Sequence, residues 1–162
     1  MADLLLIVDD SVVMHHVLKR IMSRSLWPKD QILEASNGQE GLKLARTPGV
    51  SLVLSDIQMP VMGGLEMLQK IREDENLGHV LVLMVTAVTT CAAEVKAREL
   101  GAAGYIRKPF DPDQITSEVT RVWAAAGRQR LVVPPPLVQL PTRLALRPTI
   151  CVTRVRVRKT SA

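Results

Sequence analysis

Aromatic residues and cysteines are scarce in this sequence, and both shortages narrow what the protein can be. The 162 residues include four aromatic ones, namely Trp27, Tyr105, Phe110 and Trp123. The core must therefore be aliphatic, which a hydrophobic content of 47% permits. Cys91 and Cys151 lie far apart, without the spacing of a metal site or a C-x-x-C pair, so we expect free thiols in a reducing compartment.

Long hydrophobic runs are also missing. No apolar stretch approaches the roughly 18 residues that a membrane-spanning helix needs. The start of the chain has neither the basic region nor the length of a signal peptide, because Asp9 and Asp10 interrupt its first apolar run. We therefore expect a cytoplasmic protein that has no membrane partner.

Acidic residues do not occur in the last part of the chain. Residues 1–126 carry 13 Lys and Arg against 16 Asp and Glu, a net charge of −3, whereas residues 127–162 carry 8 basic residues and no acidic one, a net charge of +8. The overall charge of +5 therefore does not indicate that the folded part binds nucleic acid. Several prolines favour extended chain here, so we expect a domain at 1–126 and a non-globular, disordered or loosely packed basic tail at 127–162.

Short aliphatic runs alternate with helical patterns up to about residue 125. The runs cover residues 4–8, 31–35, 51–55, 80–85 and 104–106, and helices are expected after Ser11, at 37–46, after Gly64, at 89–100 and after Asp111. Five βα units of this length predict an α/β fold, a doubly wound five-stranded parallel sheet. A closed eight-stranded barrel would need roughly 250 residues.

The apolar spacing in two helices predicts their buried faces. In the first helix Val13, Val17 and Ile21, with Met14 and Leu18, form an apolar stripe. The last helix should bury Ile115, Val119 and Val122.

Other side chains have a simple structural interpretation. His15 and His16 diverge on the first helix by about 100°, so we expect both to be exposed and neither to bind a metal. Cys91 should be a small buried residue. Five methionines are expected to fill the core: Met14, Met59, Met62, Met67 and Met84.

Charged residues follow three of the predicted strands. Asp9 and Asp10 come after the first, Asp56 after the third and Lys108 after the fifth. The carboxyl ends of parallel strands meet at one edge, so these groups should share a pocket. Each pair of carboxylates about 4 Å apart costs on the order of 4 kcal/mol at an effective dielectric near 20, so the cluster needs cations. A divalent metal with Lys108 balances it, which predicts a Mg²⁺-dependent phosphoryl-acceptor site with an aspartate as acceptor.

Four segments in order carry a family resemblance. They are Leu-Ile-Val-Asp-Asp-Ser at 6–11, Ser-Asp-Ile-Gln-Met-Pro-Val-Met-Gly-Gly at 55–64, Val-Thr-Ala at 85–87 and Lys-Pro-Phe at 108–110. Together they resemble the receiver domain of two-component response regulators, in particular the stand-alone CheY-type members. The resemblance extends over about residues 3–125 and implies a flavodoxin-like (βα)5 fold with the strand order 2-1-3-4-5.

The resemblance also implies how the acceptor site works. Asp56 would be the phosphorylated residue. Asp10, Asp56 and the backbone carbonyl of Gln58 would hold Mg²⁺, with Asp9 acting through a coordinated water. The family also catalyses its own dephosphorylation.

The same resemblance implies roles for five residues around the acceptor. The hydroxyl of Thr86 and the ammonium of Lys108 would each contact a phosphoryl oxygen. The conformational signal would pass from Thr86 to Tyr105 on the fifth strand. Gln58 and Val88 would flank the acceptor and control access of the hydrolytic water.

The expected function is a single-domain response regulator of a two-component phosphorelay. Its phosphodonor would be a histidine kinase or phosphotransfer protein, and its output a downstream protein target. An aspartyl-phosphate phosphatase of the haloacid dehalogenase type is an alternative, but it would place Asp-x-Asp after the first strand. A DNA-binding regulator using the basic tail is another, although few aromatic residues are available to stack on bases.

Overall fold

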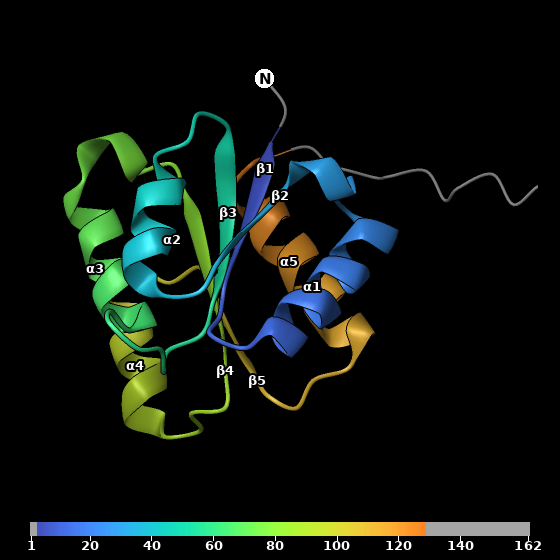
Figure 1. Cartoon of the computed structure of the whole chain (residues 1–162). Helices are drawn as coiled ribbons and strands as arrows, with labels where there is room; N and C mark the ends of the chain where they lie inside the picture. The colour runs from blue at the N-terminus through green and yellow to red at the C-terminus, as the bar shows by residue number, and fades with distance from the viewer. Residues whose placement is uncertain (1–2, 129–162) are drawn as a thin grey trace, which may run out of the picture.

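The computed structural model describes residues 3–128 and shows five strands and five α-helices in alternation (Figure 1). The strands are β1 (Leu4–Val8), β2 (Ile32–Ala35), β3 (Val50–Ser55), β4 (Leu81–Thr86) and β5 (Gly104–Arg107). The helices are α1 (Val12–Ser25), α2 (Gly38–Ala45), α3 (Gly64–Glu73), α4 (Cys91–Glu99) and α5 (Pro112–Ala125). Two short 3-10 turns, Lys29–Gln31 and Glu75–Leu77, complete the described elements.

All strand pairs are parallel, in the order β2-β1-β3-β4-β5. This confirms the predicted doubly wound, flavodoxin-like sheet. Helices α1 and α5 cover one face, and α2, α3 and α4 cover the other (Figure 1). Val8 lies opposite Ser55, and Thr86 lies opposite Arg107. This register places the residues that follow β1 beside those that follow β3, at one edge of the sheet.

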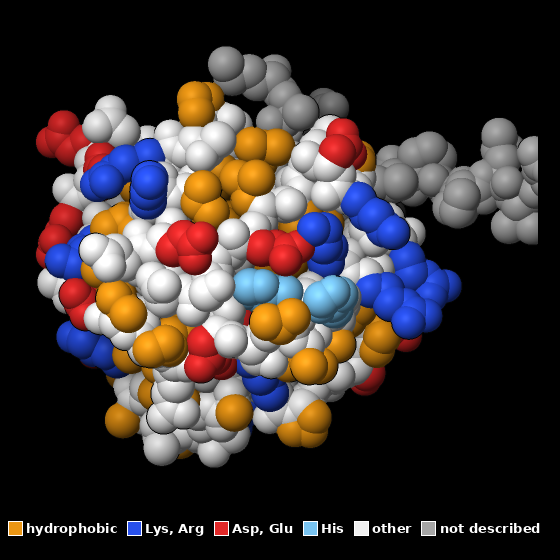
Figure 2. Space-filling view, viewed as in Figure 1, with side chains coloured by type: hydrophobic (Ala, Val, Ile, Leu, Met, Phe, Trp, Pro, Cys, Tyr) orange, Lys and Arg blue, Asp and Glu red, His pale blue; other side chains and the backbone are white. Residues whose placement is uncertain are grey.

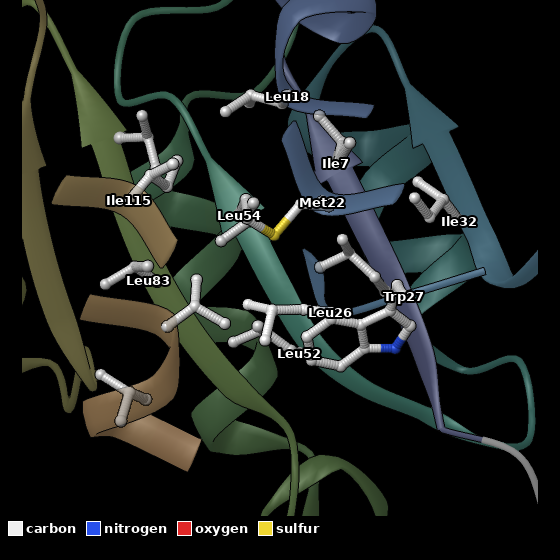
Figure 3. Close-up of a cluster of buried hydrophobic side chains, with 14 of the residues drawn as sticks. Ile7, Leu18, Met22, Leu26, Trp27, Ile32, Leu52, Leu54, Leu83 and Ile115 are labelled. Atoms are coloured by element: carbon white, nitrogen blue, oxygen red, sulfur yellow. The ribbon is translucent and has the colours of Figure 1, made fainter. Parts of the chain in front are cut away.

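The core has two halves because side chains alternate along each strand. On the α1 and α5 side, Leu5 and Ile7 of β1 pack with Leu54 and Trp27 (Figure 3). On the other side, Leu6 and Val8 pack against helices α2 and α3. Every residue of β3 is buried, as expected for a central strand with both faces covered.

Side-chain caps confirm four of the predicted helix starts in the described chain, while α3 begins at Gly64 without one. The side chains of Ser11, Asn37 and Thr90 each accept a hydrogen bond from the backbone of the following helix. At α5, Asp111 and Gln114 exchange side-chain to backbone hydrogen bonds of 2.8 and 3.0 Å in a complete capping box. Ile115, Val119 and Val122 are buried as predicted.

The predicted buried face of α1 was right in part, because Leu18 is buried and the partly exposed Met14 and Ile21 pack against the core. The helix buries His15, Leu18 and Met22, while Val13 and Val17 are 71% and 38% exposed. Figure 2 shows hydrophobic side chains at the surface around the start of this helix. The pattern of apolar residues misplaced part of the buried face because burial depends on how a helix is rotated about its axis. Here the rotation turns His15 toward the sheet.

His15 is therefore buried, contrary to the prediction that it would be exposed, whereas His16 is exposed as predicted. The His15 ring is 7% exposed, and its Nδ1 lies 3.6 Å from a carboxylate oxygen of Glu34 on β2. Lys19, one turn along α1, also binds Glu34. A polar residue is accommodated at this position because β2 is an edge strand that carries an inward carboxylate.

Cys91 was also predicted wrongly, because it is exposed at the first position of α4 rather than buried. Met67 and Met84 are fully buried, and Met14, Met59 and Met62 pack against the two core halves while partly exposed. The expectation for Cys151 lies outside the described residues.

The described chain ends shortly after α5. Gly127 has a φ of +70° and its amide donates to the carbonyl of Ala124, while the amide of Arg128 donates to that of Trp123. These two bonds form the Schellman pattern that ends many helices. The Arg128 guanidinium also lies 4.8 Å from the centre of the Trp123 ring and donates to the carbonyl of His79 at 2.8 Å. Contacts with the domain thus continue to residue 128, and the tail predicted at 127–162 otherwise lies outside the described residues.

Within the described part of the chain, no helix combines the length and apolar character needed to cross a membrane.

Candidate functional site

Three charged side chains from three strand ends meet at the carboxyl edge of the sheet. The Nζ atom of Lys108, after β5, lies 2.7 Å from Oδ2 of Asp9, after β1, and 2.8 Å from Oδ2 of Asp56, after β3. The Lys108 side chain is 15% exposed, Asp9 2% and Asp56 11%. The structure thus brings together, largely out of water, residues that lie 99 and 52 positions apart in sequence.

The backbone around Asp56 holds its carboxylate in place. The Asp56 amide donates to the Val8 carbonyl at 2.9 Å, which extends the β1–β3 pairing by one residue. Its Oδ1 accepts from the amides of Ile57 at 2.6 Å and Gln58 at 3.3 Å. One carboxylate oxygen is therefore engaged by backbone amides and the other by Lys108.

Ser55 and Gly64 belong to this site, although the sequence interpretation did not include them. The Ser55 hydroxyl donates to the Asp56 carbonyl at 2.8 Å. A Cβ on Gly64 would lie 1.9 Å from that same carbonyl oxygen, so only glycine fits. The Gly63-Gly64 pair was a visible signal, but the sequence predicted from it a helix start and part of a family motif, and no contact with the acceptor.

Asp9 and Asp10 differ in their surroundings. Asp9 is buried, and its Oδ1 accepts from the Ser11 amide at 2.9 Å, so it also supports the start of α1. Asp10 is exposed. Asp9, Asp10 and Asp56 each offer one carboxylate oxygen, and these three atoms lie within 4.8 Å of one another.

This donor set fits a hard divalent cation. Carboxylate and carbonyl oxygens are the ligands that Mg²⁺ prefers. Lys108 contributes a single positive charge against three carboxylates, so the cluster is electrostatically incomplete without a further cation. Gln58 lies in the loop that follows Asp56, and its carbonyl as a ligand stays a prediction.

Burial and hydrogen bonding oppose each other at Asp56. Burial alone would raise its pKa, but hydrogen bonds from Lys108 and Thr86 outweigh it and hold the pKa below the ordinary value. Burial likewise favours a lower pKa for Lys108, but its bonds to Asp56 and Asp9 raise it overall. The acceptor is therefore an ionised carboxylate at neutral pH, paired with a charged ammonium.

Thr86 and Tyr105 are connected through Val88. The amide of Val88 donates to the hydroxyl oxygen of Thr86 at 3.2 Å, and the hydroxyl of Tyr105 donates to the carbonyl of Val88 at 2.6 Å. Thr86 is fully buried, and Tyr105 is partly buried against the α2, α3 and α4 side of the core. Thr86, at the end of β4, and Tyr105, on β5, are thus joined through one residue of the loop between β4 and α4.

The sequence of this chain is similar to those of known proteins. Residues 5–120 match the family model of the response regulator receiver domain. The chain is 29% identical over 120 residues to the "Probable transcriptional regulator ycf29" of Pyropia yezoensis, and 35% identical over 119 residues to "Histidine kinase P4" of Formosa agariphila. These matches cover 74% and 73% of this chain but only 53% and 8% of the relatives, so the chain spans about half of one and a small part of the other.

Two solved structures show the same fold. A CheY-like response regulator receiver domain protein of Methanospirillum hungatei JF-1 has a TM-score of 0.69 at 25% identity, covering 78% of this chain and 98% of that one. A chain of the CheX-CheY-BeF3-Mg complex of Borrelia burgdorferi has a TM-score of 0.66 at 27% identity, covering 75% of this chain and 89% of that one.

Proposed function

Because this chain belongs to the response regulator receiver domain family, we propose that it is a phosphorelay switch that accepts a phosphoryl group on Asp56 from a histidine kinase. The observation that carries the proposal is the position of the Lys108 ammonium, which bonds both Asp56 and Asp9 inside a cluster of three carboxylates. A phosphoryl group on Asp56 would therefore lie next to the Lys108 ammonium, which already binds the Asp56 carboxylate.

Phosphoryl transfer to Asp56 requires an ionised and oriented carboxylate. A carboxylate oxygen attacks the phosphorus of a phosphohistidine in line, the new P–O bond forms as the P–N bond breaks, and the released imidazole takes a proton from water. The lowered pKa keeps the attacking group ionised. The Ile57 and Gln58 amides hold it in orientation, so little reorganisation is needed.

Asp9, Asp10, Asp56 and the Gln58 carbonyl are the residues that would hold Mg²⁺. When bound, the ion supplies positive charge that offsets the charge on the phosphoryl oxygens. The structurally similar CheX-CheY-BeF3-Mg complex of Borrelia burgdorferi supports this choice of ion.

The output would start at Thr86. Its hydroxyl oxygen now accepts from the Val88 amide, and turning the hydroxyl toward a phosphoryl oxygen would change that contact. Val88 also accepts the Tyr105 hydrogen bond, so the change would reach β5. A downstream protein that binds the surface around Tyr105 would then distinguish the two states.

The central test is Mg²⁺-dependent phosphorylation of the full chain by acetyl phosphate and by a panel of purified histidine kinases. Intact-protein mass spectrometry should detect one added phosphoryl group that requires Mg²⁺ and is lost in Asp56→Asn. Asp30→Asn, an exposed aspartate outside the site, is the matched control and should be labelled normally. Undiminished labelling of Asp56→Asn would overturn the proposal.

A further inference from the structure

A pocket of about 110 Å³ lies between the last turns of α1 and α5. Its walls are aliphatic and aromatic: Leu26, Trp27, Val119, Trp123 and Ala124. Figure 3 shows Trp27 beside Leu26 and Leu52 on this side of the sheet. Both helices begin near the acceptor loops, and α1 is 14 residues long, or about 21 Å, so the pocket is separate from the phosphoryl site.

The walls of the pocket are mostly apolar, and contacts within the domain hold their aromatic rings. The rings of Trp27 and Trp123 meet edge to face, with centroids 5.0 Å apart and planes at 88°. The Trp27 indole N–H donates to the Asp3 carbonyl at 2.8 Å, and the Thr120 hydroxyl, also in the lining, donates to the Thr116 carbonyl at 2.7 Å. A dry apolar cavity of about 150 Å³ is known to bind benzene, so a pocket of this kind suits a single small ring.

The rim of the pocket carries one positive charge. Among the lining residues in the described chain, Arg128 is the charged one, and no acidic residue contributes to the lining. Its guanidinium donates to the His79 carbonyl at 2.8 Å, and the nearest Asp3 carboxylate oxygen lies 3.5 Å from Nη1. Because a guanidinium has five N–H donors, Arg128 can bind an anion without leaving these partners.

We propose that this pocket binds a small aromatic carboxylate, with the ring against Trp27 and Trp123 and the carboxylate on Arg128. Apolar walls select the ring, and the Arg128 guanidinium, whose one acidic partner in the described chain is Asp3 at 3.5 Å, selects the negative charge. The proposal is independent of phosphoryl transfer, because none of these residues belongs to the acceptor site.

The test is a titration of the full ¹⁵N-labelled chain with benzoate and with benzamide, its neutral counterpart. The chain has two tryptophans, and both line the pocket, so both indole N–H signals report on it directly. Both signals should shift, with a dissociation constant for benzoate on the order of 1 mM or lower, as expected for so small a ligand.

Two comparisons between variants separate the contribution of the ring to binding from that of the carboxylate charge. Ala124→Leu should fill the pocket and abolish both titrations, whereas Ala125→Leu, at the next exposed position and outside the lining, should leave them unchanged. Arg128→Gln should weaken benzoate about two- to fivefold and leave benzamide unaffected. Unshifted indole signals, binding that survives Ala124→Leu, or an equal effect of Arg128→Gln on both probes would each overturn the proposal.

Discussion

The Cβ position of Gly64 lies 1.9 Å from the backbone carbonyl oxygen of Asp56. The first residue of α3 thus packs directly on the peptide that carries the acceptor, and the Ser55 hydroxyl binds the same oxygen. The start of one helix and the orientation of the acceptor carboxylate are therefore mechanically linked.

Gly64→Ala should displace Asp56 because backbone, rather than a flexible side chain, opposes the added methyl group. We expect a loss of about 2–4 kcal/mol in the free energy of unfolding, measured with urea, as for overpacking in a core. Gly78→Ala, where the nearest atom would be 3.7 Å away, is the control. If both variants unfold alike and are phosphorylated alike, Gly64 does not position the acceptor.

The lowered pKa of Asp56 predicts how stability depends on pH. A carboxyl group whose pKa is depressed by folding stabilises the folded state above its unfolded pKa, about 3.9. This contribution is lost as the pH falls through the lower folded value. The unfolding free energy of Asp56→Asn should therefore fall less between pH 6 and pH 3 than that of the wild type. Parallel curves for the two proteins would contradict the assigned pKa direction.

Replacement of Gln58 should change the lifetime of the phosphorylated form. Its side chain is exposed beside the acceptor, and its amide reaches Asp56, so it is placed to control the approach of water. Gln58→Ala should alter the dephosphorylation rate more than the phosphorylation rate, as measured by decay after the phosphodonor is removed. An unchanged decay rate would count against this role.

His15→Leu should stabilise the domain. The Nε2 atom of His15 is the one buried side-chain polar atom without a hydrogen-bond partner in residues 3–128, and such a group costs about 1–3 kcal/mol. We expect urea unfolding to show a gain of about 1 kcal/mol, since Lys19 still binds Glu34. His16→Leu on the exposed face is the control and should change little. A destabilised His15→Leu would show that the Glu34 contact outweighs the unpaired nitrogen.

Truncation tests the domain boundary. A 1–128 chain keeps the Gly127 helix end and the contacts of Arg128 with Trp123 and His79, which a 1–126 chain loses. Both should fold and accept phosphate. The shorter one should unfold about 1 kcal/mol more easily, because a helix end and a cation-π contact are missing. If 1–128 does not fold cooperatively, the residues after it are part of the domain.

Local sequence patterns were enough to predict the elements and their starts. Aliphatic runs gave all five strands to within one or two residues, because strands covered on both faces bury mostly aliphatic side chains. Ser11 and the Asp111–Gln114 box predicted helix starts, because a cap satisfies backbone groups within a few residues. The grouping of Asp9, Asp56 and Lys108 followed from parallel strands that end at one edge.

Only the tertiary structure decided how those elements face one another. The sequence of α1 favoured burying Val13 and Val17, but in the structure His15 lies inward beside Glu34 of β2. The close contact of Gly64 with Asp56 and the link from Thr86 through Val88 to Tyr105 join segments distant in sequence. Patterns within one segment report its own periodicity and caps, whereas side-chain contacts between segments depend on distances that exist only once the chain has folded.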